Sequence, residues 1–251
     1  MKRSNQRNLS YGLGKRRKKA TAQDGNNNKR TEDDPISTEA ALTFFHAMFN
    51  PEKFDGRVPP IIFTHQLYSV VNNKTQVDRE VNELKEKKEV KVFCLGSETE
   101  TCIVFTKDYK DCLRKNDRCP SAITEKFISK VVDGSKDLTF NKSTMTQFGF
   151  PEQEITQLVN GGLLTVRALG NWWLAIPGAG VFMKCYRKGR EAILRTIRTS
   201  RFKEILLQDL EGRKLQAVQP LGMKYHIYDI LGAESVTKIQ TTSGVLLKYD
   251  E

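Results

Sequence analysis

Three pairs of short apolar runs recur along the chain, and a polar turn joins the two runs of each pair. The runs are rich in β-branched and aromatic residues, a pattern typical of β-hairpins. The pairs are Val90–Leu95 with Cys102–Phe105, Leu163–Arg167 with Trp172–Ile176, and Ser235–Ile239 with Val245–Tyr249. Turns are expected at residues 96–101, 170–171 and 243–244. Because the hairpins end near residues 106, 176 and 249, the chain is predicted to contain three similar units.

The interval before each hairpin has helical periodicity. One clear stripe is Val77, Val81 and Leu84, spaced as residues on one helix face. Pro151 suits a first helical position, while Gly161-Gly162 and Gly232 suit helix ends. The predicted helices are Ser37–Phe49, Thr64–Val71, Thr75–Lys88, Ser121–Val132, Ser143–Gln147, Pro151–Asn160, Phe182–Thr199, Arg201–Leu210 and Leu221–Leu231.

Three helices and a two-stranded hairpin in about 70 residues form the plan of a winged helix, a relative of the helix-turn-helix. The predicted fold class is therefore mainly α with small β-hairpins (α+β), as three tandem winged-helix domains. We expect them at residues 35–118, 119–179 and 180–251, after an arm at residues 1–34. Units this small have limited cores, so they are expected to pack on one another.

The arm differs from the rest of the 251-residue chain, which carries a net charge of +11. Its 34 residues hold ten Lys or Arg and four Asp or Glu, and they are poor in apolar side chains. Such a segment buries too little surface to offset the entropy of ordering, so it is predicted to be disordered. The block Lys15-Arg16-Arg17-Lys18-Lys19 predicts a nuclear-import signal with an auxiliary role in DNA binding. A solvated charge run is the alternative interpretation.

Cofactor, metal and membrane functions find little support in the sequence. The five cysteines form no CxxC pair, and the three histidines lie far from any close pair of cysteines. Structural zinc usually needs two close pairs of ligands, so reduced thiols and no cofactor are expected. Apolar runs of the ~18 residues that cross a membrane are also missing.

Catalysis likewise lacks candidate residues. The glycine-rich loop, His-Arg-Asp and Asp-Phe-Gly motifs of a kinase are absent, and Gln147 precedes Phe148-Gly149 where a metal-binding Asp would stand. The segment Gly178-Ala-Gly180 matches two glycines of a dinucleotide-binding fingerprint, but Met183 occupies the third position. A hinge between units is the preferred interpretation of these glycines. The chain is therefore predicted not to be an enzyme.

Positive charge is concentrated in residues 184–214. This span has ten basic and four acidic residues. The basic residues are Lys184, Arg187, Lys188, Arg190, Arg195, Arg198, Arg201, Lys203, Arg213 and Lys214. At about 100° per residue, one side of the helix is apolar, made by Phe182, Tyr186, Gly189, Ile193 and Ile197. The opposite side carries five cations with one acid, Glu191, among them: Lys184, Arg187, Lys188, Arg195 and Arg198. A row of like charges repels itself, and a polyphosphate would relieve the repulsion and release counterions. The span is thus predicted to bind nucleic acid, with an ordinary basic helix face as the alternative.

The helices that would enter the major groove carry little of this charge. Pro151–Asn160 has two acids and no Lys or Arg, and Leu221–Leu231 has only Lys224. We therefore expect contacts to phosphates with little sequence specificity. Double-stranded DNA is the expected partner, with single-stranded DNA and RNA as further candidates, and a homodimer is left open.

Several longer motifs resemble one family, the inactive serine/threonine-protein kinase 19 family. The resemblance covers about residues 35–251 and is strongest from residue 147 onward. The motifs are Gln147-Phe-Gly-Phe150, Glu154-Ile-Thr156, Leu158-Val-Asn160, Leu164-Thr-Val-Arg167, Trp172-Trp-Leu-Ala175, Pro177-Gly-Ala-Gly180 and Thr241-Thr-Ser-Gly244. Lys184, Lys188-Gly189-Arg190, Arg198, Arg201 and Arg213 also match basic positions of the family, whereas Arg195 falls where the family can carry a small polar residue.

This resemblance implies tandem winged helices that bind DNA and RNA in a nuclear, chromatin-associated protein. It also implies a role in transcription-coupled nucleotide-excision repair, as a bridge between stalled RNA polymerase II complexes and TFIIH. The alternative is a protein-interaction scaffold that docks protein partners without binding DNA. The acidic segment Pro151–Asn160 suits that second use.

Overall fold

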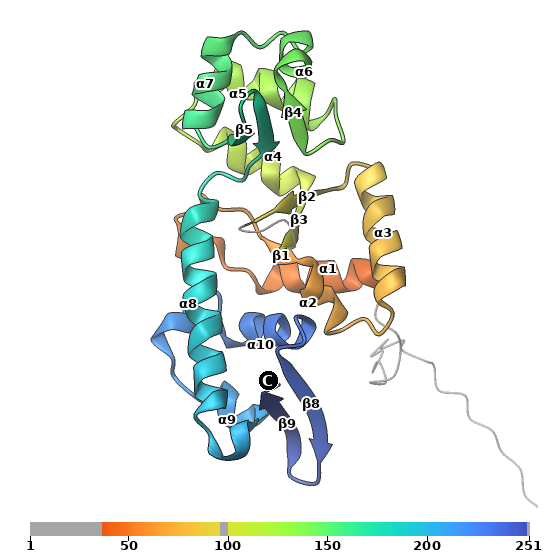
Figure 1. The fold of residues 1–251 in the computed structure, drawn as a ribbon, viewed down its shortest axis with the longest axis vertical. Coiled ribbons are helices and arrows are strands. Elements are labelled where there is room, and N and C mark those ends of the chain that lie inside the picture. Colours follow the sequence, from red (N-terminus) through yellow and green to blue (C-terminus); the bar gives the residue numbers. More distant parts are fainter. Residues whose placement is uncertain (1–36, 96–99, 250–251) are drawn as a thin grey trace, which may run out of the picture. The chain divides into compact units, whose positions relative to one another are not determined.

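One order of elements occurs three times in the computed structural model, which describes residues 37–95 and 100–249 (Figure 1). Each copy has a helix, a short strand, two further helices and a two-stranded hairpin, and the short strand adds to the hairpin as a third antiparallel strand. The predicted arm with Lys15–Lys19 lies outside the described residues, as does most of the turn predicted at residues 96–101.

The first copy begins at Ser37, whose side chain accepts a hydrogen bond from the Ala40 N–H and so caps the first helix. In its sheet, β3 lies between β1 and β2, with Val92 opposite Ile103. The elements are α1 (Thr38–Met48), η1 (Pro51–Phe54), β1 (Ile62–Phe63), α2 (Thr64–Tyr68), α3 (Lys74–Glu86), β2 (Val90–Cys94) and β3 (Thr101–Phe105).

The second copy follows a connecting helix, α4 (Thr106–Arg114), which the sequence pattern did not predict. Asn141 caps α6 by accepting from the Thr144 N–H at 2.8 Å, and Gly162 has the left-handed φ of +76° expected after α7. The elements are α5 (Ser121–Phe127), continued by a π-helical turn η2 (Ile128–Val132), then β4 (Thr139–Asn141), α6 (Lys142–Gln147), α7 (Glu152–Asn160), β5 (Leu164–Ala168) and β6 (Asn171–Leu174).

The third copy begins with the 20-residue helix α8, and its sheet has β9 between β7 and β8. Its elements are α8 (Ala179–Arg198), η3 (Arg201–Lys203), β7 (Glu204–Leu206), α9 (Leu207–Glu211), η4 (Gln216–Val218), α10 (Met223–Gly232), β8 (Val236–Thr241) and β9 (Gly244–Tyr249). The predicted fold class, mainly α with small antiparallel sheets in a winged-helix arrangement, is confirmed. The domain boundaries at residues 118/119 and 179/180 stay a prediction.

Two details of the predicted third unit are wrong. Residues 201–210 are not one helix: Phe202 and Lys203 have positive φ angles of 61° and 57°, which break the helical path, and Glu204–Leu206 then pair with β9. Gly232 is the last residue of α10 rather than its left-handed stop, and Glu234 carries the positive φ instead. A Cβ on Gly232 would lie 1.8 Å from the His65 carbonyl oxygen, so this glycine allows α10 to approach α2.

The largest hydrophobic cluster contains residues from all three copies. Phe63 of the first copy packs against Tyr186 of the third, with 4.4 Å between the ring centroids, and Phe127 and Phe150 of the second belong to the same cluster. Separate clusters fill the remainder of the first copy and of the third. Burial of these side chains across the copies gives each small unit more apolar contact than it could make alone.

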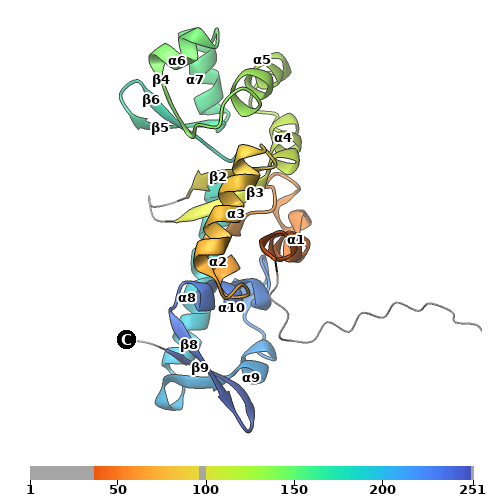
Figure 2. The same ribbon diagram turned by 90° about the vertical axis from the view of Figure 1, so that its right-hand side faces the viewer.

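Buried hydrogen bonds also connect the copies. The buried Lys91 donates to the Ser135 carbonyl oxygen at 2.7 Å, and its burial lowers the pKa of its ammonium group to about 8. Tyr225 donates to the Ile61 carbonyl oxygen at 2.8 Å. Figure 2 shows α10 beside α2, which agrees with the contacts between these helices. Packing against the first and second copies therefore holds α8, the helix that carries the candidate site, in place.

Candidate nucleic-acid interface

Helix α8 has one buried side and one cationic side, as the sequence predicted. Phe182, Tyr186, Gly189, Ile193 and Ile197 are buried. The exposed cations follow along the opposite side, over an arc of about 100° at the usual helical rotation. They are Lys184, Arg187, Lys188, Arg195 and Arg198. Figure 1 shows α8 extending from the end of the second copy, past the first, to the third.

Four further cations continue the charge beyond α8. Arg201 and Lys203 are exposed in η3, directly after the helix. Arg213 and Lys214 are exposed in the segment between α9 and η4, and η4 packs against α8. We call these nine exposed residues the basic surface: Lys184, Arg187, Lys188, Arg195, Arg198, Arg201, Lys203, Arg213 and Lys214. Arg187 lies 4.0 Å from a Glu100 oxygen, at the limit of an ion pair, and one exposed acid, Glu191, lies among the cations of α8.

Two guanidinium groups of the basic surface lie over aromatic rings. Arg198 lies 5.6 Å from the centroid of Tyr249, and Arg201 lies 4.8 Å from that of Phe202. These are cation–π distances, and they restrict where the two cations point. The sequence prediction did not include either aromatic residue. An apolar residue placed between Arg201 and Lys203 was the signal that could have identified Phe202.

Arg190, which was predicted to contact nucleic acid, lies in a different environment. Its side chain is 24% exposed, and one terminal nitrogen donates to the Tyr186 hydroxyl oxygen at 2.9 Å. Its other terminal nitrogen donates to the Ser235 hydroxyl oxygen at 2.9 Å. The same side chain is 3.5 Å from the Asp229 carboxylate. We leave Arg190 out of the basic surface because its donors are used inside the protein.

Asp229 is the centre of this internal network and is fully buried. Its Oδ1 accepts a hydrogen bond from the Tyr186 hydroxyl at 2.6 Å and lies 2.6 Å from His65 Nε2. Burial and the neighbouring carboxylate raise the pKa of Tyr186, so its hydroxyl keeps the proton that it donates. The network thus joins α2 of the first copy to α8 and α10 of the third.

His226 is buried beside this network. Its ring is 6.1 Å from that of Tyr186, and neither ring nitrogen has a hydrogen-bond partner among the described residues. Burial lowers the pKa of His226 to about 4, so the ring is neutral at pH 7. A Cβ on Gly189 would lie 2.2 Å from His226 Nε2, which explains the glycine in the middle of α8. His226 therefore packs in the core and has no access to a substrate.

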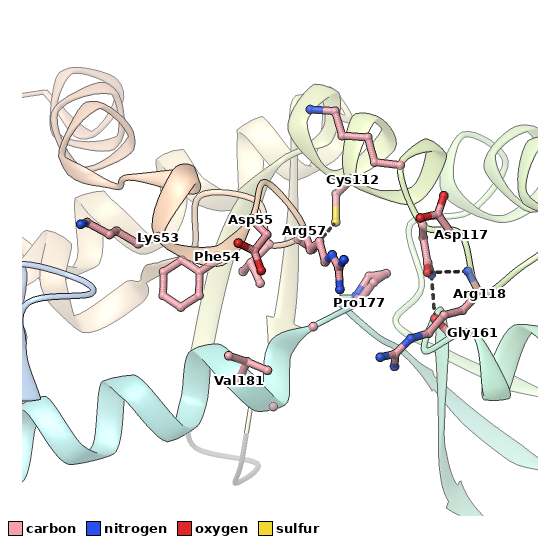
Figure 3. Close-up of a pocket in the computed structure, with 15 residues that line it drawn as sticks. Lys53, Phe54, Asp55, Arg57, Cys112, Asp117, Arg118, Gly161, Pro177 and Val181 are labelled. Carbon is pink, nitrogen blue, oxygen red and sulfur yellow. Dashed lines mark hydrogen bonds between the residues drawn. The ribbon is translucent and has the colours of Figure 1, made fainter.

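A cavity of about 500 Å³ lies at the beginning of α8 (Figure 3). Its lining includes four cations and two carboxylates: Lys53, Arg57, Lys115, Arg118, Asp55 and Asp117. The Cys112 thiol donates to the Arg57 carbonyl oxygen at 3.3 Å, and burial raises its pKa to about 12. That thiol is protonated at pH 7 and is not a nucleophile. Gly178 has a φ of +77° and approaches Val58, so it forms a tight turn between the second copy and α8.

The described residues contain no group of three or more His, Cys, Asp or Glu side chains that could hold a metal ion. Among the helices of residues 37–95 and 100–249, none is long and apolar enough to cross a membrane. The chemistry that α8 offers is that of exposed cations held on one helix, and such cations can neutralise phosphates.

Known proteins of similar sequence identify the family of this chain. A model of the family described as inactive serine-threonine protein kinase 19 matches residues 45–249. The chain is 39% identical over 246 residues to a protein of Homo sapiens named winged helix repair factor 1, covering 96% of this chain and 95% of the human protein. The relatives of the same name in Mus musculus and Xenopus laevis are each 40% identical, over 227 and 215 residues, covering 87% and 84% of this chain and 89% and 83% of those proteins.

Proposed function

This chain belongs to the inactive serine-threonine protein kinase 19 family, and we propose that it is a repair factor that binds nucleic acid through the basic surface. Its winged helices and its relatives' name support a non-catalytic protein connected with repair. The observation that carries the proposal is the row of five exposed cations along one side of α8, continued by Arg201 and Lys203. Closely spaced cations on a rigid helix match the repeating phosphates of nucleic acid.

The expected mode of binding is phosphate contact. In the third copy, α10 has the position of a recognition helix, but five of its ten residues are buried side chains other than glycine: Tyr225, His226, Ile227, Asp229 and Ile230. In the second copy, α7 has no Lys or Arg to offer phosphates, and Glu152 and Glu154 in its first turn pair with Lys142 and Lys126. Neither helix is suited to reading base edges, so the surface is expected to bind with little sequence specificity.

Binding to duplex DNA is expected to weaken steeply with salt. Five to nine phosphate contacts would give a slope of about −4.5 to −8 for the logarithm of the association constant against that of salt concentration. Fluorescence anisotropy with two duplexes of unrelated sequence, measured across a salt series, tests this. We expect both duplexes to give the same affinity and slope. A slope near zero, or an affinity confined to one sequence, would contradict the proposed mode.

We also propose that the chain acts in transcription-coupled nucleotide-excision repair, as a bridge between stalled RNA polymerase II complexes and TFIIH. The family resemblance supports this role, and the second copy supplies a surface of suitable chemistry for protein contacts. There Val166 is 57% and Leu169 fully exposed on the β5–β6 hairpin, and α7 is acidic. Exposed apolar side chains favour a protein partner over a polyanion.

A nuclear and chromatin-associated location is part of this proposal. Replacing Lys15, Arg16, Arg17, Lys18 and Lys19 with Ala is expected to move a tagged protein towards the cytoplasm, because clustered cations are what import receptors recognise. Fluorescence microscopy gives the ratio of nuclear to cytoplasmic protein. The matched control replaces Lys29 and Arg30, which are basic residues of the same arm outside the block. An unchanged ratio for the Lys15–Lys19 variant would assign import to another part of the chain.

A further inference from the structure

Phe202 is a large apolar side chain exposed within the basic surface. It is 72% exposed and lies between Arg201 and Lys203 at the turn that follows α8. A single exposed apolar residue is ordinary on a protein surface. Two further observations distinguish Phe202: the backbone that carries it, and the charges that surround it.

The backbone at Phe202 is in a conformation that side chains with a Cβ disfavour. Phe202 has φ 61° and ψ 15°, and the next residue, Lys203, has φ 57°. Two consecutive left-handed residues that are not glycine are unfavourable and persist only when the surroundings fix them. Here the Lys203 N–H donates to the Ser200 carbonyl oxygen at 3.0 Å, and Glu204 enters β7 and pairs with Lys248 of β9. The turn therefore exposes the aromatic ring to solvent. A glycine, which adopts this backbone conformation readily, would have placed no side chain there.

One cation lies against this ring, a second lies nearby along the chain, and much of the ring is accessible. The Arg201 guanidinium lies 4.8 Å from the ring centroid, and Arg198 lies one turn back along the chain, over Tyr249. Among the described residues, Glu204 follows Lys203 in the chain and is paired with Lys248 at 3.3 Å. An open aromatic ring beside phosphate-binding cations is the combination that proteins use for single-stranded nucleic acid, where bases stack on the ring.

We propose that Phe202 stacks against an unpaired base, so that the basic surface prefers single-stranded or locally opened nucleic acid to fully paired duplex. This inference rests on the proposed function, because the cations of the basic surface must hold the backbone near the ring. A paired duplex offers its phosphates to these cations but keeps its bases stacked within the helix. An opened strand offers both groups, and it gains the stacking contact in addition to the ionic ones.

The test compares three probes bound to the full chain: a short single strand, the matched duplex, and that duplex with a central unpaired bubble. The wild-type chain is expected to bind the bubble more tightly than the duplex. Phe202→Ala is expected to weaken binding to the single strand and the bubble by about five- to a hundredfold. The duplex affinity should stay within about twofold, and the salt slope should not change, because no phosphate contact is lost.

Three variants control this comparison. Phe202→Gly removes the ring and fits the left-handed backbone, so it preserves the test if Phe202→Ala does not fold. Phe202→Trp keeps an aromatic face and should retain the preference for unpaired bases. Leu169→Ala removes a different exposed apolar side chain, on the second copy, and should change none of the three affinities.

Several results would overturn the inference. Equal losses on duplex and single strand would show that Phe202 supports the surface as a whole. Unchanged single-strand affinity would show that the ring makes no stacking contact. If that affinity is unchanged while light scattering detects a loss of self-association, the ring lies between two copies of the chain. A wild-type chain that binds none of the probes would instead refute the proposed function, which separates the two failures.

Discussion

Charge reversal of Arg198 and Arg201 together is expected to lower the affinity for duplex DNA by on the order of a hundredfold at low salt. Arg198 is the last residue of α8 and Arg201 the first of η3, and both are exposed. Each lost phosphate contact also lowers the magnitude of the salt slope by about one, so the double variant should lose about two. The loss should be nearly the same for any duplex sequence, because phosphates carry no base identity.

The matched control for this variant combines Arg79→Glu on α3 with Lys87→Glu directly after that helix. It changes the net charge by the same amount at two exposed positions outside the basic surface. We expect its DNA affinity to fall by less than about threefold, through the general field alone. Both double variants should remain folded, since exposed substitutions typically change the unfolding free energy by about 0.5 kcal/mol or less.

The result also separates the two classes of function. If the folded Arg198→Glu, Arg201→Glu variant keeps the wild-type affinity and salt slope, the basic surface does not bind DNA. If it keeps DNA binding but loses a protein partner, the scaffold interpretation of the sequence is favoured. Pull-down of candidate repair partners with the same two variants therefore belongs beside the anisotropy measurement.

The parts of the fold that the sequence predicts well are those whose pattern is local. The three hairpins carry alternating β-branched and aromatic residues, and α8 carries a continuous apolar stripe from Phe182 to Ile197. The third strand of each sheet is different: β1, β4 and β7 contain only two or three residues. A period of two cannot be recognised in so short a run, and these strands form because a neighbouring hairpin offers free backbone groups.

The predicted helix Arg201–Leu210 shows how tertiary contacts override local preference. Leu207 and Leu210 are spaced as residues on one helix face, and both belong to the hydrophobic cluster of the third copy. Ile205, by contrast, reaches the core from a strand, because β7 pairs with β9 residues 40 to 44 positions later. The local periodicity of the sequence cannot predict that β7 pairs with so distant a strand.

The same limit explains Arg190. Its place in the basic span made it a candidate for phosphate contact, yet its partners are Tyr186 and the distant Asp229 and Ser235. At about 100° per residue, position 190 lies nearer to the buried stripe than to the row of exposed cations. The helical angle could therefore have suggested that Arg190 is partly buried. Its acidic partner Asp229, however, lies 39 residues further along the chain, beyond the reach of helical periodicity.

Replacing Asp229 with Ala is expected to lower the free energy of unfolding by about 3–5 kcal/mol, because it removes a buried carboxylate that His65, Tyr186 and Arg190 all approach. Arg190 would keep its charge in a half-buried place without that counterion, and the Tyr186 hydroxyl would lose its acceptor. The network joins α2 to α8 and α10, so the loss should affect the first and third copies together. Urea denaturation followed by far-UV circular dichroism should show a lower midpoint with an unchanged slope.

The control for Asp229 is Glu234→Ala. Glu234 lies just after α10 and pairs with Lys74 of α3, so this ion pair also joins the third copy to the first. Both partners are exposed, at 73% and 54%, and exposed pairs contribute about 0–1 kcal/mol because water solvates the separated charges nearly as well. The two acids thus connect the same pair of copies and differ mainly in burial. If Asp229→Ala destabilises the chain no more than Glu234→Ala does, the apolar cluster around Phe63 and Tyr186 holds α8 in place, and the buried network does not.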